Sequence, residues 1–173
     1  MGRRLGRHAL DGCLNDMTQV PSSFIELIAT VTGAIEGEPI APPLAATLTA
    51  KFPPGSTVFD EIEALCHQGV ADGWLCAREQ GGIKFGRPIK PGPETHGFSV
   101  DVVEMNDIEG PHHSHPNGEI DMVMPIDAHA TFDGVPRGWK VYAPGSTHRP
   151  TVRGGKALVL YLLPQGAIEF TRA

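Results

Sequence analysis

The hydrophobic period of the sequence changes near Gly73, and this change divides the chain into a helical part and a β part. Between residues 22 and 72, apolar residues recur at the three- and four-residue spacing of amphipathic helices. The pattern is clearest in SSFIELIATVTGAIEG and STVFDEIEALCHQGVADG, and LAATLTAKF predicts a short helix between them. Two prolines precede that short segment, and prolines are tolerated at a helix entry.

From Trp74 onward, apolar runs are short, and glycine- and proline-rich segments separate them. The runs are GWLCARE, IKFGRPIK, HGFSVDVVEM, GEIDMVMPI, WKVYAPG and KALVLYLLP. Several short strands with turn signals between them are typical of an antiparallel sandwich or small barrel. The sequence therefore predicts a mainly β protein with N-terminal helices, an α+β arrangement, whose barrel is wide enough for one small ligand.

This pattern predicts three parts: a flexible leader over residues 1–16, a helical segment over 17–73 and a barrel over 74–173. The leader is basic but lacks the apolar stretch of a secretion signal, and no run approaches the roughly 20 apolar residues of a membrane span. The 3 cysteines are widely spaced and form no CxxC pair. We therefore expect a reduced, cytoplasmic protein.

The charge of the chain argues against some partners. With 14 Lys and Arg against 20 Asp and Glu, the net charge of −6 gives no basis for binding nucleic acid or an anionic membrane. A local excess of basic residues surrounds the segment QGGIKFG. Arg78 and Arg87 there, and Arg149 elsewhere, are candidates for binding a substrate carboxylate, because a guanidinium offers a planar two-point fit. The alternative is a solvated hairpin.

The segment GPHHSHPNGE, residues 110–119, crowds three histidines and a glutamate into one short stretch. His113 and His115 are two apart, so in an extended segment they point to the same face, which Glu119 shares if the segment stays extended. Two imidazoles and a carboxylate form the facial triad of non-haem iron and related metals. PGSTH adds His148 as a fourth candidate ligand. The alternative is a polar, solvated loop.

The pattern His113-x-His115-x3-Glu119, followed by Gly145-x2-His148, resembles the two motifs of the cupin superfamily. The resemblance implies a cupin-type antiparallel jelly-roll barrel with these four side chains as ligands. A glycine expected after Glu119 is absent, which affects the expected turn geometry more than the ligands. Such a ligand set accepts a divalent ion of iron, manganese, nickel, cobalt or zinc.

A longer resemblance covers residues 52 to 170 and includes GRPIKPGPETHGFSVDVVEMNDIEGPHHSHPNGEIDMVMPI and YAPGSTHRPTVRGGKALVLYLLPQGAIEF. These stretches are similar to the 4-hydroxylaminobenzoate lyase family of nitroaromatic catabolism. Members of that family convert 4-hydroxylaminobenzoate to protocatechuate and ammonia. The resemblance implies a metal-dependent lyase acting on this or a similar small aromatic carboxylate.

Two further side chains are candidate catalytic groups. Asp121 has the same strand parity as Glu119 and is a candidate general base, with a solvated or salt-linked carboxylate as the alternative. Tyr161 is a candidate hydrogen-bonding partner of the substrate ring, with simple packing as the alternative.

Two other functions stay open from the sequence alone. One is a cupin dioxygenase acting on a catechol or aminophenol ring, and the other is a non-catalytic cupin that binds a small anion. In each case we expect a homodimer or a higher homo-oligomer, because the helices cannot all cover one small barrel and its strand edges need protection.

Overall fold

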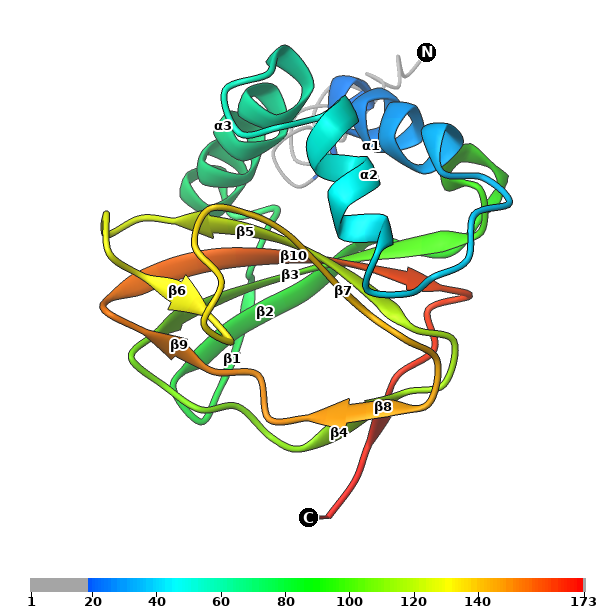
Figure 1. Ribbon diagram of the computed structural model, residues 1–173. Helices are drawn as coiled ribbons and strands as arrows, with labels where there is room; N and C mark the ends of the chain where they lie inside the picture. The colour runs from blue at the N-terminus through cyan, green and yellow to red at the C-terminus, as the bar shows by residue number, and fades with distance from the viewer. Residues whose placement is uncertain (1–18, 173) are drawn as a thin grey trace, which may run out of the picture.

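The computed structural model describes residues 19–172, so the leader predicted over residues 1–16 lies outside the described part of the chain (Figure 1). Three α-helices come first in this range: α1 (Ser22–Ala34), α2 (Leu44–Lys51) and α3 (Thr57–Asp72). The strands that follow are β1 (Arg78–Gln80), β2 (Ile83–Ile89), β3 (Phe98–Asn106), β4 (His113–His115), β5 (Glu119–Pro125), β6 (Thr131–Phe132), β7 (Gly138–Tyr142), β8 (Ser146–His148), β9 (Val152–Arg153), β10 (Lys156–Pro164) and β11 (Glu169–Phe170). A short 3-10 helix, η1 (Pro93–Thr95), precedes β3.

The strands form two facing layers of antiparallel pairs (Figure 1). One layer is a six-stranded sheet in the order β1-β2-β3-β10-β5-β7, and the other consists of the small sheets β11-β4-β8 and β6-β9. Between β3 and β10 the chain passes back and forth between the layers, with β3, β5, β7 and β10 in the large sheet and β4, β6, β8 and β9 opposite. This order defines a jelly roll, so the predicted fold is confirmed, although the sheets do not close into a complete barrel.

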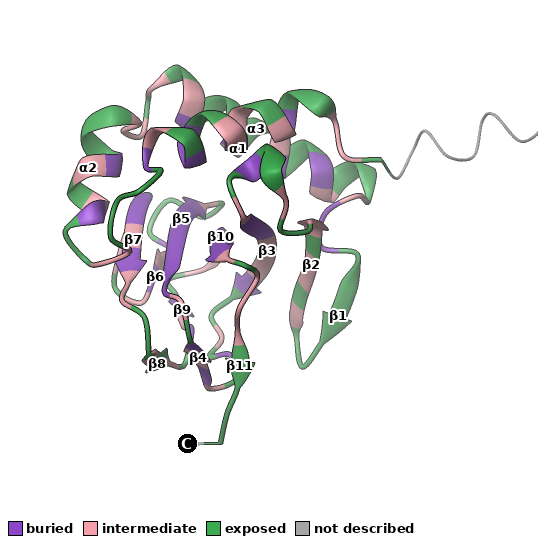
Figure 2. Ribbon diagram, turned by 90° about the vertical axis from the view of Figure 1, so that its right-hand side faces the viewer, coloured by how far each residue is buried: buried purple, intermediate pink, exposed green. Residues whose placement is uncertain are grey.

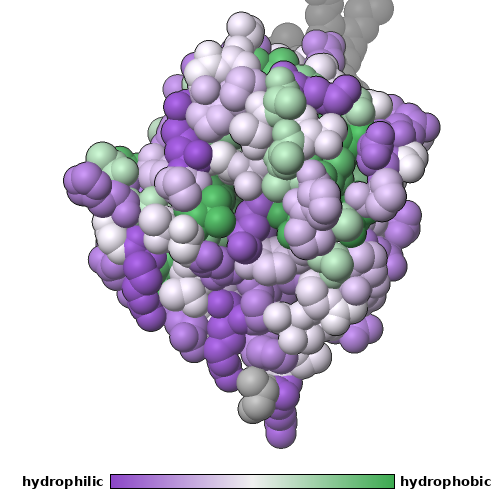
Figure 3. All heavy atoms as spheres, viewed as in Figure 1, coloured by the Kyte–Doolittle hydropathy of each residue, from purple (hydrophilic) through white to green (hydrophobic). Residues whose placement is uncertain are grey.

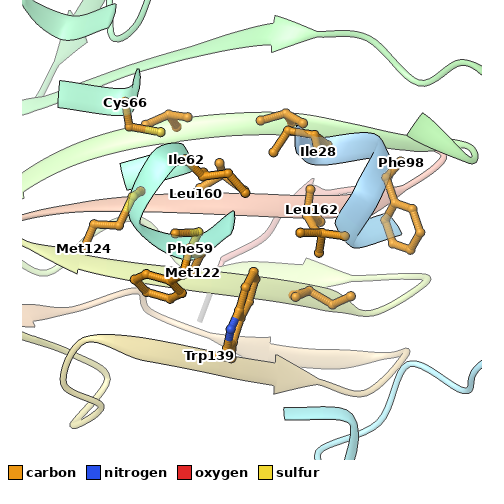
Figure 4. Close-up of a cluster of buried hydrophobic side chains, with 14 of the residues drawn as sticks. Ile28, Phe59, Ile62, Cys66, Phe98, Met122, Met124, Trp139, Leu160 and Leu162 are labelled. Carbon is orange, nitrogen blue, oxygen red and sulfur yellow. The ribbon is translucent and has the colours of Figure 1, made fainter. Parts of the chain in front are cut away.

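The central strands β3, β10 and β5 of the large sheet are buried on both faces for most of their length. The outer face of the sheet packs against the helices, as Figure 2 shows, and Phe59 of α3 lies edge-on to Trp139 of β7 with ring centroids 5.7 Å apart. Other members of this outer core, drawn in Figure 4, are Ile28, Ile62, Phe98, Met122, Met124, Leu160 and Leu162. The inner face holds a second core that includes Val123, Phe132, Val159 and Leu163. Burial on both faces explains why β10 is a nearly continuous apolar run, whereas the inner face of β5 begins with the buried acidic residues Glu119 and Asp121.

The prediction of a strand over GWLCARE is wrong for most of that segment, because β1 begins only at Arg78. Gly73 ends α3 in the left-handed conformation, with φ of 84°. The backbone N–H groups of Trp74 and Leu75 then both donate to the carbonyl oxygen of Gly69, at 3.1 Å. These residues therefore continue the turn at the helix end, and their N–H groups are not free to pair with a strand.

Within the described residues, no helix combines the length and the apolar character needed to cross a membrane. On the face seen in Figure 3, hydrophobic residues gather mainly over the helical layer, and the part over the small sheets is mostly hydrophilic. The edge strand β1 is exposed along its whole length. An exposed edge is what a homo-oligomer would protect, and self-association stays a prediction that light scattering can test.

Candidate metal centre

The four predicted ligands reach the interior of the jelly roll from facing strands. His113 and His115 lie on β4, and His148 lies on β8, directly opposite His113 in the strand pairing. Glu119 is the first residue of β5, in the other layer. The segment does not stay extended from His113 to Glu119, since the chain turns a corner between β4 and β5. Glu119 joins the histidines from across the barrel.

Gly118 makes this corner possible. Its φ of 87° lies in the left-handed region that favours glycine. A Cβ at this position would lie 2.5 Å from Cγ2 of Ile40 and 2.9 Å from the carbonyl oxygen of Tyr142. Because neither the conformation nor the space suits a side chain, the corner depends on glycine.

The ligand atoms of the four side chains all lie within 4.8 Å of one another. His115 Nε2 is 2.8 Å from Glu119 Oε2, and His113 Nε2 is 3.7 Å from the same oxygen. His148 Nε2 is 3.9 Å from Glu119 Oε1 and 3.0 Å from His113 Nε2. His115 and Glu119 are fully buried, and His113 is nearly so. The predicted cluster is thus formed and shielded from water.

Hydrogen bonds on the far side of each imidazole show which nitrogen carries the proton. Nδ1 of His113 lies 3.2 Å from the carbonyl oxygen of Pro111, and Nδ1 of His148 lies 2.7 Å from Oδ2 of Asp133. A carbonyl and a carboxylate can only accept, so both Nδ1 atoms donate. In a neutral imidazole the lone pair is then on Nε2, and the Nε2 atoms of His113 and His148 face the centre of the cluster.

His115 follows the same pattern through a hydroxyl group. Its Nδ1 lies 2.9 Å from Oγ of Ser146, and that hydroxyl donates its own hydrogen to the carbonyl oxygen of Ala143 at 2.6 Å. Ser146 can therefore only accept from the ring, and Nε2 of His115 presents a lone pair. Partners of this kind fix the tautomer and orientation of metal-binding histidines.

The atoms that meet at the centre of the cluster, imidazole nitrogens and carboxylate oxygens, are all hydrogen-bond acceptors, and such a set suits a cation. Within the described residues, Nε2 of His115 and both carboxylate oxygens of Glu119 are buried without a hydrogen-bond partner. A buried carboxylate beside three imidazole lone pairs needs positive charge between them. The site can therefore hold a divalent ion of the iron, manganese, cobalt, nickel or zinc group.

Asp121 is placed close to this cluster but away from solvent. It is fully buried, and both of its carboxyl oxygens lack a hydrogen-bond partner in the described part of the chain. Burial raises the pKa of Asp121 well above its usual range, and the charge of Glu119 adds to the increase. A carboxyl group that keeps its proton is better suited to donate than to accept, so the raised pKa does not favour the role of general base, which stays a prediction.

A cleft of about 1010 Å³ opens beside His113 between the β1–β2 hairpin and the small sheets. Arg78 and Phe85 line the hairpin wall, Phe170 lines the opposite wall, and Tyr161 lies among the lining residues of β10. The ring of Phe170 is 69% exposed, and its centroid lies 5.8 Å from that of His113. An aromatic ligand in this cleft would meet aromatic side chains close to the candidate metal ligands.

The structure separates the three arginines predicted to bind a carboxylate. Arg78 and Arg87 both line the cleft. The guanidinium of Arg87 is already engaged, because Nε donates to Asp101 at 2.8 Å and Nη2 donates to the carbonyl oxygen of Gly166 at 3.1 Å. Arg149 pairs with Glu109 at 3.7 Å and is not among the described residues that line the cleft. Arg78 is thus the arginine best placed to meet a ligand.

Asp133 and Phe170 are candidate site residues that the sequence did not single out. Asp133 lies in the segment DGVPRG, and aspartate is so common in turns that nothing marks this one as different. Phe170 follows the last long strand by several residues, and no periodicity places it near the histidines. Both positions follow only from the three-dimensional arrangement.

A jelly roll whose interior gathers His113, His115, Glu119 and His148 from these two motifs has the architecture and site of a cupin. Within that class, the chain belongs to the 4-hydroxylaminobenzoate lyase family, because the family model described as "PnbB: 4-hydroxylaminobenzoate lyase" matches residues 26–170.

Two relatives carry the same name. A 4-hydroxylaminobenzoate lyase from Nocardioides sp. (strain LMS-CY) is 32% identical over 160 residues, which cover 87% of this chain and 94% of the relative. A 4-hydroxylaminobenzoate lyase from Pseudomonas putida is 34% identical over 140 residues, which cover 71% and 80% of the two chains.

Solved structures resemble the chain more distantly. An RmlC-like cupin protein from Ralstonia eutropha JMP134 matches 56% of this chain and 64% of its own, with 12% identity and a TM-score of 0.43. A conserved protein with a double-stranded β-helix domain from Klebsiella pneumoniae matches 56% and 90%, with 16% identity and a TM-score of 0.39. The strand order of the chain, and not these matches, defines the fold.

Proposed function

We propose that the protein is a metal-dependent lyase that converts 4-hydroxylaminobenzoate, or a similar small aromatic carboxylate, and water to protocatechuate and ammonia. The observation that carries the proposal is the cluster of four buried, mutually facing acceptor groups beside a cleft with aromatic walls. The two named relatives support the choice of substrate. The overall reaction is redox-neutral: cleavage of the N–O bond reduces the nitrogen by two electrons and releases its oxygen as water, a ring carbon that gains a hydroxyl group from water is oxidised by two, and hydrolysis of the C–N bond by a second water releases ammonia.

In this proposal His113, His115, Glu119 and His148 hold a divalent ion. A bound ion of this kind supplies Lewis acidity toward a substrate oxygen. The protein contributes binding and orientation: Phe85 and Phe170 contact the substrate ring from opposite walls of the cleft.

Tyr161 acts as a hydrogen-bond donor to a ring substituent. Burial raises the pKa of Tyr161 well above its usual range, and the nearby carboxylate of Glu119 adds to the increase. Its hydroxyl therefore keeps its hydrogen at neutral pH. A donor at this position orients the substrate without itself ionising.

Anaerobic incubation tests the function directly. Metal-loaded protein, given 4-hydroxylaminobenzoate without oxygen or a nicotinamide cofactor, should release protocatechuate and ammonia in equal amounts, measured by chromatography and an ammonia assay. Removal of the metal with a chelator should stop the reaction, and adding the metal back should restore it.

Other outcomes of the same assay point to the alternatives. Turnover of a catechol or aminophenol that requires oxygen, without reaction of the hydroxylamine, would replace the lyase by a ring-cleaving dioxygenase. Binding of aromatic acids without turnover of any of these substrates would indicate a non-catalytic cupin.

Arg78 is the proposed partner of the substrate carboxylate. Arg78→Ala should raise KM by roughly 10-fold to 100-fold, since a hydrogen-bonded charge contributes about 1.5–3 kcal/mol. The value of kcat should change little, because a clamp remote from the N–O bond binds ground state and transition state about equally.

Arg149→Ala is the matched control, because Arg149 carries the same charge and pairs with Glu109 at the cleft margin, but is not itself among the described residues that line the cleft. Steady-state kinetics of both variants decide the point. An unchanged KM in Arg78→Ala would remove Arg78 from the proposal, and Arg87 would then be the next candidate.

A further inference from the structure

Asp133 lies where three hydrogen bonds from different parts of the chain meet. Its Oδ2 accepts from Nδ1 of His148 at 2.7 Å and from the hydroxyl of Tyr142, and its Oδ1 accepts from the backbone N–H of Thr151 at 2.8 Å. The side chain is only 14% exposed. One carboxylate thus connects the turn after β6 to β7, to β8 and to the segment before β9.

The backbone at Asp133 is held in an uncommon conformation. Its φ of 48° lies in the left-handed region, which few residues other than glycine adopt, although aspartate and asparagine do so more readily than most. The backbone N–H of Asp133 donates to the carbonyl oxygen of Thr151 at 2.8 Å, which closes a reciprocal pair with the side-chain bond to Thr151. Surrounding contacts therefore fix the position of this carboxylate.

His148 differs from the other two histidines of the cluster in the partner of its Nδ1. His113 donates to a carbonyl oxygen and His115 to a hydroxyl, whereas His148 donates to a carboxylate. His148 is also the most exposed of the three, at 11% for its side chain against 3% and 0%. The ligand with the least packing around it therefore has the strongest type of hydrogen-bond partner.

Tyr142 extends the effect of Asp133 to a second histidine. The ring of Tyr142 packs against His148, with centroids 4.5 Å apart, and against His115, with centroids 5.3 Å apart. Because the hydroxyl of Tyr142 is bound to Asp133, the same carboxylate also fixes the aromatic ring that contacts two members of the cluster.

From this geometry we infer that Asp133 is the positioning residue that makes His148 competent to bind the metal. Asp133 holds the proton of His148 on Nδ1, so the lone pair of Nε2 faces Glu119. It also fixes the rotation of the imidazole through the bond at 2.7 Å. This inference rests on the proposed metal site, but the link between Asp133 and His148 exists independently of any bound ion.

Asp133→Ala tests the inference by two independent measurements. In metal-free protein, two-bond ¹H–¹⁵N NMR should show His148 with its proton on Nδ1 in the parent protein and a mixture of both tautomers in the variant. In a calorimetric Zn²⁺ titration with a competing chelator, the variant should bind about 10-fold to 100-fold more weakly, the usual effect of removing a group that orients a ligand.

Asp107→Ala is the matched control. Its carboxylate accepts from the backbone N–H groups of Gly154 and Gly155, at 2.8 and 3.2 Å, and so stabilises a neighbouring loop without touching a histidine. Asp133→Gly suits the left-handed backbone conformation at this position and removes both acceptor oxygens, and it replaces Asp133→Ala in both measurements if the alanine variant fails to fold. The control should keep the parent tautomer at His148 and the parent Zn²⁺ affinity.

The outcomes separate this inference from the proposed function. An unchanged His148 tautomer in the Asp133 variant, or equal loss of affinity in the Asp107 control, would overturn the positioning role. If the parent protein binds no Zn²⁺, the proposed metal site is wrong, and the claim that Asp133 prepares His148 to bind metal is wrong with it. The NMR measurement still decides whether Asp133 sets the tautomer of His148.

Discussion

His115→Ala is expected to lower metal affinity by more than about 100-fold while the protein stays folded, since loss of a direct ligand should exceed the roughly 10-fold to 100-fold effect of an outer partner. His115 is fully buried, and its Nε2 lies 2.8 Å from Glu119. The fold should persist because the larger core lies on the opposite face of the six-stranded sheet, under the helices. Plasma mass spectrometry of the dialysed protein measures the loss of metal, and circular dichroism shows whether the fold is kept.

His112→Ala is the matched control, because His112 precedes the cluster in the same segment and its Nδ1 pairs with the hydroxyl of Thr171 instead. This variant should keep the parent metal content. The alanine variants of His113 and His148 should behave like His115→Ala. If all three kept the parent stoichiometry, the ligand assignment would be refuted.

Phe59→Ala should cost about 3–5 kcal/mol of unfolding free energy, as large truncations in a well-packed core do. Phe59 is fully buried, lies edge-on to Trp139 and carries the guanidinium of Arg137 over its ring at 5.1 Å. It therefore anchors α3 to the outer face of the sheet. For a chain of this size, the melting temperature should fall on the order of 10 °C.

Phe170→Ala removes the same side chain from an exposed position, and it should change the unfolding free energy by less than about 1 kcal/mol. Denaturant and thermal unfolding of both variants provide the comparison. If Phe59→Ala lowered the unfolding free energy as little as Phe170→Ala, the contact between α3 and the sheet would contribute little to stability, contrary to the packing observed.

The histidine ligands could be predicted from the sequence because two residues apart in a strand share a face, and His113 and His115 do lie together on one strand. The corner before Glu119 could not be predicted, because the two-residue alternation of side chains along a strand does not indicate where the strand ends. Its position depends on the backbone conformation of Gly118 and on contacts with the distant Ile40.

The arginines show a second limit of sequence patterns. Arg87 has the same charge and chain neighbourhood as Arg78, yet only Arg87 is tied to Asp101 and Gly166. That difference arises from the pairing of β2 with β3, which contains a register shift between Gly86 and Ile89. Asp133 was missed for a similar reason, because its partners follow it by 9, 15 and 18 residues without a repeating pattern.

Glu119 lies in one layer of the jelly roll, and the three histidines of the cluster lie in the other. A preference of the candidate site for one metal over another can therefore change through the spacing of the layers. The distance between carboxylate and imidazoles is set by the separation of the layers, and thus by apolar residues between them, such as Phe132 and Val159. The ring of Phe132 lies 6.2 Å from that of His148. Changes in the size of such side chains would alter the radius of ion that the four candidate ligands accommodate, so selection for a different metal in the proposed site would act on residues that never touch the ion.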